Sequence, residues 1–521
     1  MVALVAGLAM AGGSTAQERV LLDTVVERER LVLEIDHAEV QVFVDPGGEA
    51  ILQATVDPTQ EGAVDLEPLA LELEEGDAVV RRRAVAGGPT PRLRVDVLVP
   101  PEVVLVVRGL DLLVQLESAV PTEEGGGAAV DGASAGDTGS DGVPGDALET
   151  GRQPSEGASG VASAGGPAPP RATAKGAAPL AIELDLADSE LIARDVERIG
   201  GRLVNSSATV NETRGGLFFE VLQSFLDVEG HRGPTSLTVD GSEVSFSESE
   251  GRHRFLVSAS SVSIDEASGE LAAQLSRGAR FTVQGFRGPT TLEGDGSWFE
   301  GRRLWATAGK GLEVRGTNLD AVLEDCRGKS YEIHLDGGRF SGSGFVGRGQ
   351  VTGLNGTAID LEDTNGRVAL FLRNRSTARV AEARGRVEAN TESSELEVED
   401  VQQLKLTAKD STVRARGLDT VTDFRAQGSE LDIDLTTLRN TKPIVHLLAE
   451  TRGEIRLAAP CLVQVKSEDA LGASNVSVSG CELKRHGEGN RSRAPTRTDG
   501  TRMIRLTLDV APDAEVDVVG Y

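Results

Sequence analysis

The sequence has few aromatic residues, few cysteines and no long apolar run. Among its 521 residues are 2 Trp, 2 Tyr, 13 Phe and 3 Cys. No uncharged apolar stretch reaches the roughly 18 residues that a membrane-spanning helix needs, so we expect no transmembrane segment in the mature chain. The cysteines are too few for a disulfide scaffold, and they lack the closely spaced Cys and His pairs of a zinc site.

Cations are also scarce relative to acids. The chain has 53 Lys and Arg residues against 82 Asp and Glu residues, which gives a formal net charge of −29. Because nucleic-acid binding depends on cations that neutralise phosphates, this balance argues against a nucleic-acid partner.

Motifs of known chemistry are missing as well. The 6 His residues show no metal-ligand spacing, and no P-loop occurs. We therefore assign no catalytic, cofactor-binding or metal-binding residue, and we expect each His to be a solvated strand or turn residue.

The amino-terminal segment resembles a secretory signal peptide. Residues Val2 to Ala11 are apolar, and the small residues Ser14, Thr15 and Ala16 precede Gln17. This pattern is typical of an apolar region followed by a cleavage site, although a cationic start is missing. We expect residues 1–16 to be removed and the protein to be exported, to the periplasm, the outer surface or the medium.

Residues 119–178 differ sharply in composition from the rest of the chain. Of the 58 residues from Pro121 to Ala178, 38 are Gly, Ala, Ser or Pro and none is aromatic. A segment of this kind cannot bury enough apolar surface to offset its chain entropy, so we predict a disordered linker.

The rest of the chain is periodic. A small residue, here called the anchor, is followed two and four places later by apolar or small residues, and this unit recurs every 17 to 19 residues. Anchors of the first block are Ser189, Ser206, Ser224, Ser242, Ser260, Ala279 and Ser297; those of the second are Thr357, Ser376, Ser394, Ser411 and Ser429. Glycine often stands nine residues after the anchor, at Gly215, Gly233, Gly251, Gly269, Gly288, Gly366 and Gly385.

Two short alternating segments per unit predict an all-β fold, a parallel β-solenoid (β-helix) with about 18 residues per turn. Stacked turns pair their backbones and line up their apolar positions. We expect the anchors at tight inward corners and the glycines where the backbone bends sharply. An antiparallel meander of nine-residue hairpins is the alternative. The predicted division is 1–16 signal peptide, 17–118 first coils, 119–178 linker extruded as a loop, 179–453 solenoid repeats and 454–521 closing strands.

A family resemblance supports this reading. The segment from Val95 to Val107 (VDVLVPPEVVLVV) resembles the opening of exported bacterial β-solenoids of the adhesin type, the auto-transporter adhesin head (GIN) domains. The patterns Gly453 to Leu457 and Glu515 to Val519 are similar to the closing strands of that family. The resemblance implies a location at the cell surface or envelope and supplies no catalytic residues.

The period breaks between residues 297 and 357, where aromatic and cationic residues gather. We predict a ligand patch of Trp298, Arg302, Arg303 and Trp305, because rings and cations together suit sugars or anions. The alternative is that the rings of this region, with Tyr331, Phe340 and Phe345, fill a wider core. A basic run from Lys484 to Arg505 is either a solvated loop or a contact to an acidic polymer.

Cys461 and Cys481 lie about one turn apart, so stacking would bring them within disulfide distance, unless the 20-residue spacing puts them out of register. Taken together, the sequence predicts an exported protein with a structural or adhesive role and no enzymatic activity. The expected partners are cell-envelope polysaccharide or surface proteins, and no cofactor is expected. The alternative is a carbohydrate-active β-helix enzyme that acts on extracellular or envelope polysaccharide.

Overall fold

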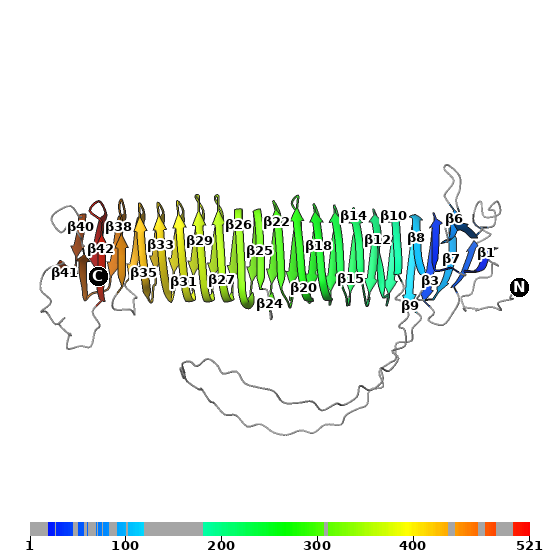
Figure 1. The fold of residues 1–521 in the computed structure, drawn as a ribbon, viewed down its shortest axis with the longest axis horizontal. Coiled ribbons are helices and arrows are strands. Elements are labelled where there is room, and N and C mark those ends of the chain that lie inside the picture. The colour runs from blue at the N-terminus through cyan, green and yellow to red at the C-terminus, as the bar shows by residue number, and fades with distance from the viewer. Residues whose placement is uncertain are drawn as a thin grey trace, which may run out of the picture.

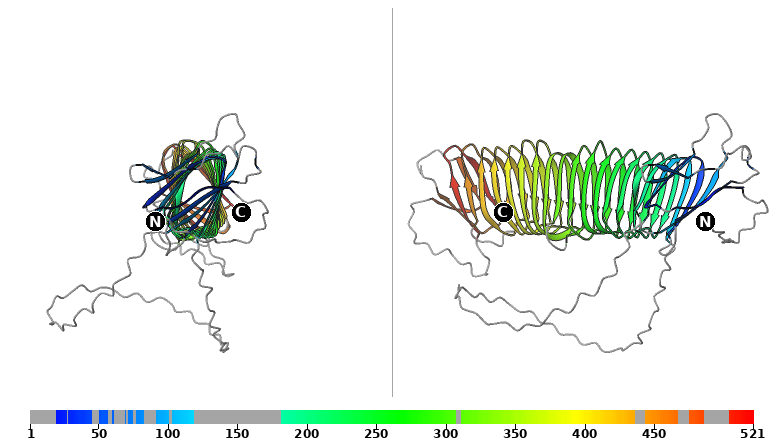
Figure 2. Two further views of the ribbon diagram at one scale, coloured as in Figure 1. Left: turned by 90° about the vertical axis from the view of Figure 1, so that its right-hand side faces the viewer. Right: turned by 45° about the vertical axis from the view of Figure 1, so that its right-hand side comes forward.

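The structure is a computed structural model that describes residues 19–26, 28–44, 50–56, 60, 69, 71–74, 77–82, 91–100, 103–118, 181–306, 311–435, 443–466, 475–485 and 504–521. Within these ranges the chain forms 43 β-strands and no helix. The strands lie side by side across a straight rod (Figure 1). Seen along its length, the rod has a compact, closed cross-section (Figure 2).

The strands pair in two rows along the rod. Row A contains, in spatial order, β5 (Leu71–Glu74), β6 (Asp77–Arg82), β2 (Arg30–Ile35), β8 (Val104–Leu110), β10 (Ala181–Ala187), β12 (Arg198–Val204), β14 (Leu217–Leu222), β16 (Thr235–Asp240), β18 (Glu250–Ser258), β20 (Ser268–Ser276), β22 (Thr290–Asp295), β25 (Leu312–Glu324), β26 (Arg327–Ser343), β27 (Val346–Leu354), β29 (Asn365–Arg373), β31 (Arg384–Glu392), β33 (Gln403–Lys409), β35 (Val421–Gln427), β37 (Ile444–Leu447), β42 (Ile504–Val510), β39 (Cys461–Lys466) and β41 (Glu482–Arg485). The two-residue strand β24 (Trp305–Ala306) pairs with the start of β26.

Row B contains β1 (Arg19–Val26), β4 (Ala50–Val56), β7 (Leu93–Val99), β3 (Ala38–Val44), β9 (Leu112–Ser118), β11 (Glu190–Arg194), β13 (Ser207–Asn211), β15 (Phe225–Glu229), β17 (Glu243–Ser247), β19 (Ser261–Asp265), β21 (Arg280–Gln284), β23 (Trp298–Arg302), then the second halves of β25 and β26, β28 (Ala358–Glu362), β30 (Thr377–Ala381), β32 (Glu395–Glu399), β34 (Thr412–Arg416), β36 (Glu430–Leu435), β38 (Arg452–Leu457), β43 (Glu515–Gly520) and β40 (Asn475–Ser479).

This arrangement confirms the predicted parallel β-solenoid. About 15 coils, each with one strand in either row, stack from β10 to β38. Their pairing is parallel and in register, for example Val244 with Val262 and Val262 with Phe281. At a strand spacing of about 4.8 Å this part of the rod is about 70 Å long. Antiparallel pairs occur only near the amino-terminal end of the described strands, at β1–β4, β4–β7 and β5–β6.

The strands on either side of the predicted linker belong to one stack. β8 pairs directly with β10, and β9 pairs with β11. The described strands before and after the predicted linker therefore belong to adjacent coils of the same rod. Their predicted disorder concerns residues outside the described ranges.

The order of the coils departs from chain order at both ends. The coil β2/β3 lies between β6/β7 and β8/β9, and the last coil of the chain, β42/β43, lies between β37/β38 and β39/β40. In the described part of the chain, β40 and β41 end the two rows at the carboxy-terminal end. Each end thus has a coil inserted one place inward, an arrangement that the repeat pattern does not predict.

The anchors occupy one corner of every coil, as predicted. Ser242 is buried, and the residue before it, Gly241, has a φ of 60° that turns the chain. Its Oγ accepts a hydrogen bond from the backbone N–H of Ser224, one coil earlier, at 3.0 Å and donates to the Asp240 carbonyl at 2.9 Å. The same contact links Ser189 to Ser206, Ser206 to Ser224 and Ser242 to Ser260. The serine anchors therefore supply hydrogen bonds at a corner where strand pairing is interrupted.

The recurring glycines lie where successive coils approach most closely. Gly269 has a φ of 120°, and a Cβ at this position would overlap the carbonyl oxygen of Gly251 in the preceding coil. Both the conformation and the contact exclude a side chain. Gly251 makes the same approach to Gly233.

The period break around residue 319 does not interrupt the stack. β22 pairs with β25, and β25 pairs with β26 along both rows. In these coils the anchor position holds Leu319 and Gly338. Leu319 is fully buried, and Cβ atoms built on Gly294 and Gly316 would lie only 2.7 Å and 2.5 Å from its side chain. The two glycines make room for the larger side chain at the anchor position. At the period break, the missing side chains of Gly294 and Gly316 thus compensate for the larger volume of Leu319.

Candidate binding surface

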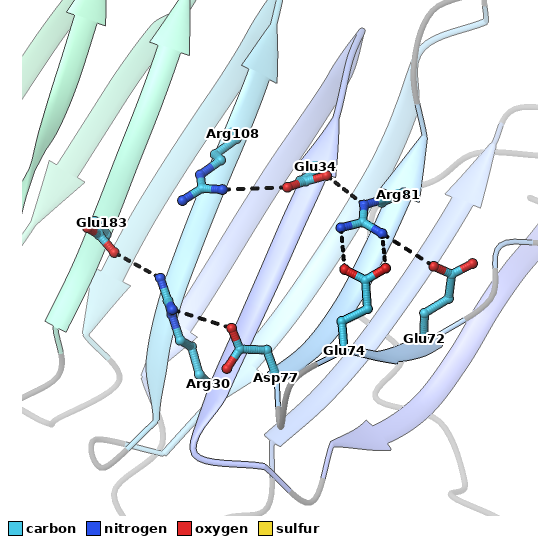
Figure 3. Close-up of polar contacts among 8 residues, drawn as sticks. All are labelled: Arg30, Glu34, Glu72, Glu74, Asp77, Arg81, Arg108 and Glu183. Atoms are coloured by element: carbon cyan, nitrogen blue, oxygen red, sulfur yellow. Dashed lines mark hydrogen bonds and ion pairs between the residues drawn. The ribbon is translucent and has the colours of Figure 1, made fainter.

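Ion pairs between neighbouring coils occupy much of the outer surface. At the amino-terminal end, Arg30 reaches Asp77 at 3.3 Å and Glu183 at 3.4 Å. Arg81 contacts Glu34 at 2.7 Å (Figure 3). The network in Figure 3 is completed by Glu72, Glu74 and Arg108. Because these side chains are partly exposed, each pair contributes about 0–1 kcal/mol, and their effect is mainly to fix which strands lie together.

Row B shows charge alternation from coil to coil in its carboxy-terminal half. Arg379 on β30 contacts Asp360 on β28 at 3.5 Å and Glu399 on β32 at 3.0 Å. Arg456 on β38 contacts Asp432 on β36 at 3.1 Å. Opposite charges on adjacent strands are favourable and like charges are not, so this pattern disfavours a slip by one coil. Arg379 and Arg456 are therefore already paired with acids of neighbouring coils.

The four residues of the predicted patch do not form one surface. Trp298 and Arg302 begin and end β23 on the outer face of row B, and the Trp298 side chain is 37% exposed. Arg303 follows at a corner, with a φ of 53°. Trp305 lies beyond that corner, in β24, at the edge of row A. The corner separates Trp305 from the outer face that carries Trp298.

Both arginines of the predicted patch are engaged by acids. Arg302 contacts Glu300 at 3.0 Å and Glu324 at 3.3 Å, and Arg303 contacts Glu266 at 3.0 Å. A ligand anion would therefore have to displace a carboxylate from either side chain. These contacts weaken the prediction that Arg302 and Arg303 hold a ligand.

Trp305 instead belongs to a cross-coil ladder with two other arginines. Arg287 pairs with Trp305, and Trp305 pairs with Arg327, so the three residues hold the same position in three successive coils. Backbone hydrogen bonds fix them: Trp305 N–H donates to the Phe286 carbonyl, and Arg327 N–H donates to the Leu304 carbonyl, both at 2.9 Å. We call Arg287, Trp305 and Arg327 the Arg–Trp ladder.

The contacts of the ladder differ from those of the paired surface cations. The guanidinium carbon of Arg287 lies 5.1 Å from the centroid of the Trp305 ring, a cation–π contact. Among the described residues, no carboxylate lies within ion-pair distance of Arg287 or Arg327. The same holds for Lys329 and Arg348, which follow on β26 and β27 and are exposed. In an acidic chain, Arg287 and Arg327 thus flank a half-buried tryptophan without an ion-pair partner among the described residues, and Lys329 follows two residues after Arg327 on β26.

The sequence contains a signal that leads to this ladder. Arg287 and Trp305 each stand eight residues after an anchor, Ala279 and Ser297, and so must occupy equivalent positions. The third member, Arg327, could not be found in this way, because the coil between Trp305 and Arg327 is longer than the 18-residue repeat. Lys310, another cation between residues 297 and 357, lies outside the described residues.

The other aromatic residues of the region fill the core, as the alternative reading predicted. Tyr331, Phe340 and Phe345 are buried, and the ring centroids of Tyr331 and Phe345 lie 4.6 Å apart. Burial raises the pKa of the Tyr331 hydroxyl. These rings are not available to a ligand.

The prediction that every His is solvated is wrong for two of them. His231 and His253 are buried, with ring centroids 6.5 Å apart. His231 Nδ1 lies 2.6 Å from Thr213 Oγ1, and His253 Nδ1 lies 3.2 Å from Thr235 Oγ1. Burial lowers the pKa of both imidazoles, that of His253 to about 4, where the proximity of His231 lowers it further. Both face inward because they occupy core positions of the repeat, where a threonine hydroxyl of the preceding coil partners each ring.

Cys461 and Cys481 are joined by a disulfide, with Cα atoms 4.9 Å apart. The bond ties the start of β39 to the residue before β41, and these two strands pair in parallel. Stacking thus brings the two cysteines together despite their 20-residue separation. Cys326 is buried and free, and burial raises the pKa of its thiol to about 12. Most of the basic run from Lys484 to Arg505 lies outside the described ranges.

Comparisons of this chain with protein-family models, curated proteins and solved structures gave no match. In the parts that the structure describes, no helix is long and apolar enough to cross a membrane. A search of the same parts found no group of three or more His, Cys, Asp or Glu residues able to hold a metal ion.

Proposed function

We propose that this protein is an exported β-solenoid with a structural or adhesive role, which acts by presenting its outer surface to cell-envelope polysaccharide or surface proteins. Export is supported by the apolar amino-terminal segment, and the surface role is supported by the resemblance to adhesin-type (GIN) solenoids. Both arguments come from the sequence.

The observation that carries the proposal is the Arg–Trp ladder. Elsewhere on the rod, surface cations commonly contact acids of the same or an adjacent coil, as Arg302 and Arg379 do. At the ladder, Arg287 and Arg327 have no such partner among the described residues and flank a tryptophan. A surface that leaves cations unpaired beside an aromatic ring is suited to binding an external ligand.

A binding role is favoured over catalysis by the placement of the polar groups. Glycoside hydrolysis commonly requires two carboxyl groups held about 5–10 Å apart across the bond that is cleaved. Two acids of this region serve as ion-pair partners: Glu266 contacts Arg303 at 3.0 Å, and Glu313 contacts Arg315 at 2.5 Å. We therefore propose that the ligand is held and not cleaved.

Two measurements on the purified full-length protein test the proposal. We expect the protein to co-sediment with insoluble envelope polysaccharide from its own cells, without release of new reducing ends. Release of reducing ends would indicate the carbohydrate-active enzyme instead, and failure to co-sediment with envelope material would refute the adhesive role.

Export has a separate test. We expect cell fractionation to place the mature protein in the envelope or the medium, with Gln17 at its amino terminus. Intact protein confined to the cytosol would contradict this part of the proposal.

A further inference from the structure

We propose that the Arg–Trp ladder, with Lys329 and Arg348, binds the carboxylate-bearing sugar units of an acidic polysaccharide. This inference rests on the proposed surface role and adds the chemical class of the ligand and the residues that recognise it.

The geometry of the ladder suits a polymer. Its three members lie in successive coils, at a spacing of about 4.8 Å, so Arg287 and Arg327 are separated by about 10 Å with Trp305 between them. In the next coil the partner of Arg327 is Val346, and Arg348 lies two residues further along β27, where it pairs with Ser330. Arg287 and Arg327 thus lie in line along the rod axis with Arg348 beside that line, and a chain laid along the axis would pass these cations in successive coils.

The chemistry of the side chains selects carboxylates. The guanidinium carbon of Arg287 lies over the Trp305 ring, and no carboxylate of the described residues forms an ion pair with its N–H groups. These donors match the two oxygens of a carboxylate, and the stacking contact holds them in place before a ligand arrives. Trp305 is half-buried, so part of its apolar ring remains accessible to the C–H groups of a sugar.

Nearby acids do not neutralise the ladder. Glu266 is held by Arg303 and Glu313 by Arg315. The net charge of −29 still repels a polyanion at long range. Binding should therefore depend on the local contacts. Because added salt screens the distant repulsion as well as the local attraction, we expect a weaker dependence on salt than a uniformly basic protein would show.

The test uses the full-length protein and fluorescently labelled oligomers of galacturonic acid, with the methyl-esterified oligomers as a neutral probe. We expect the double variant Arg287→Gln/Arg327→Gln to bind the acidic oligomer at least tenfold more weakly than the wild type. We expect Trp305→Ala to lose severalfold in affinity.

Matched controls come from the same strands or residue types. Arg339 lies on β26 like Arg327, but in row B, where it is exposed and has no ion pair with any described residue. Trp298 is the corresponding control for Trp305. We expect Arg339→Gln and Trp298→Ala to bind the acidic oligomer as the wild type does, and melting curves to show that all variants fold.

Several outcomes would overturn the inference. Equal binding of the neutral and acidic oligomers would show that carboxylates are not recognised. An equal loss in the Arg339→Gln control would show a nonspecific charge effect. If the double variant still co-sediments with envelope polysaccharide and no variant or wild type binds the oligomer, this inference fails while the proposed surface role stands. If the wild type binds neither material, both fail.

Discussion

The serine corner allows a quantitative test of what holds the coils together. Replacing Ser242 by Ala removes the Oγ that accepts the N–H of Ser224 at 3.0 Å. Both residues are buried at the corner, so the Ser224 N–H would be left without a partner and without water. An unsatisfied buried donor costs about 1–3 kcal/mol, and we expect Ser242→Ala to destabilise these coils by about 2 kcal/mol.

The matching assay is native-state hydrogen exchange resolved to single amides, because a long repeat protein does not unfold in one step. We expect the Ser224 amide in Ser242→Ala to exchange about thirtyfold faster than in the wild type, which corresponds to about 2 kcal/mol. Ser242→Thr should retain most of the protection, since Thr357 performs the same role at another anchor, where its Oγ1 accepts the Gly337 N–H at 3.0 Å.

A control on the same strand separates this corner contact from a general effect of losing a hydroxyl. Ser245 faces outward on β17, and its Oγ donates to Asp227 Oδ1 at 2.6 Å. If Ser245→Ala reduced protection of the Ser224 amide as much as Ser242→Ala does, the proposed role of the corner hydrogen bond would be refuted.

Three further predictions concern the core, its pH response and the disulfide. Val262 is 1% exposed and pairs with Val244 and Phe281 in the adjacent coils. Val262→Asp should bury an unpaired charge, lower the free energy of unfolding by several kcal/mol and unfold the adjacent coils. A variant with the wild-type β signal and melting curve in circular dichroism would contradict this. The pKa of His253 is lowered to about 4, so the unfolded chain takes up this proton before the folded one, and stability should fall as the pH falls from about 6.5 to 4. In His253→Leu, up to about 3 kcal/mol of this loss of stability at low pH should disappear, as measured by denaturant titrations at several pH values. If the free energy of unfolding depended on pH as in the wild type, the proposed role of His253 would be refuted. The bond between Cys461 and Cys481 should block alkylation of both cysteines in the denatured, unreduced protein. Reduction of the bond should destabilise the carboxy-terminal coils by about 3 kcal/mol. Alkylation of all three cysteines before reduction would contradict the presence of the disulfide.

The solenoid fold could be predicted from the repeat because each repeated position has a local structural role that depends on the size or polarity of its residue. Alternation at Val244 and Phe246 fixes which side chains face inward, and a residue with a φ between 48° and 83° stands directly before the anchor in each unit. Since successive coils use the same positions, a regular spacing in the sequence becomes a stack in space. The small size of Ser242 and the missing side chain of Gly269 were both signs of close approach between coils.

The candidate site was less predictable for the same reason. Clustering of Trp298 and Trp305 along the chain suggested one patch, but a corner between them sends the two rings to different parts of the surface. Proximity in a solenoid is set by equivalent positions in adjacent coils and not by nearness in sequence. Composition likewise failed at His231 and His253, because it does not show which face of a strand a residue occupies.

The sequence by itself determined the all-β class, the 18-residue coil, the inward corners and the apolar ladders, because each follows from periodicity and residue size. Only the tertiary structure decided the order of the coils at the two ends, where β2/β3 and β42/β43 are inserted between other coils. It also decided the partners of each surface charge, such as Arg452 with Glu515 at 3.6 Å. Backbone pairing is nearly the same for any two coils, so the choice among stacking orders depends on side-chain contacts between segments far apart in the chain, which no local pattern contains.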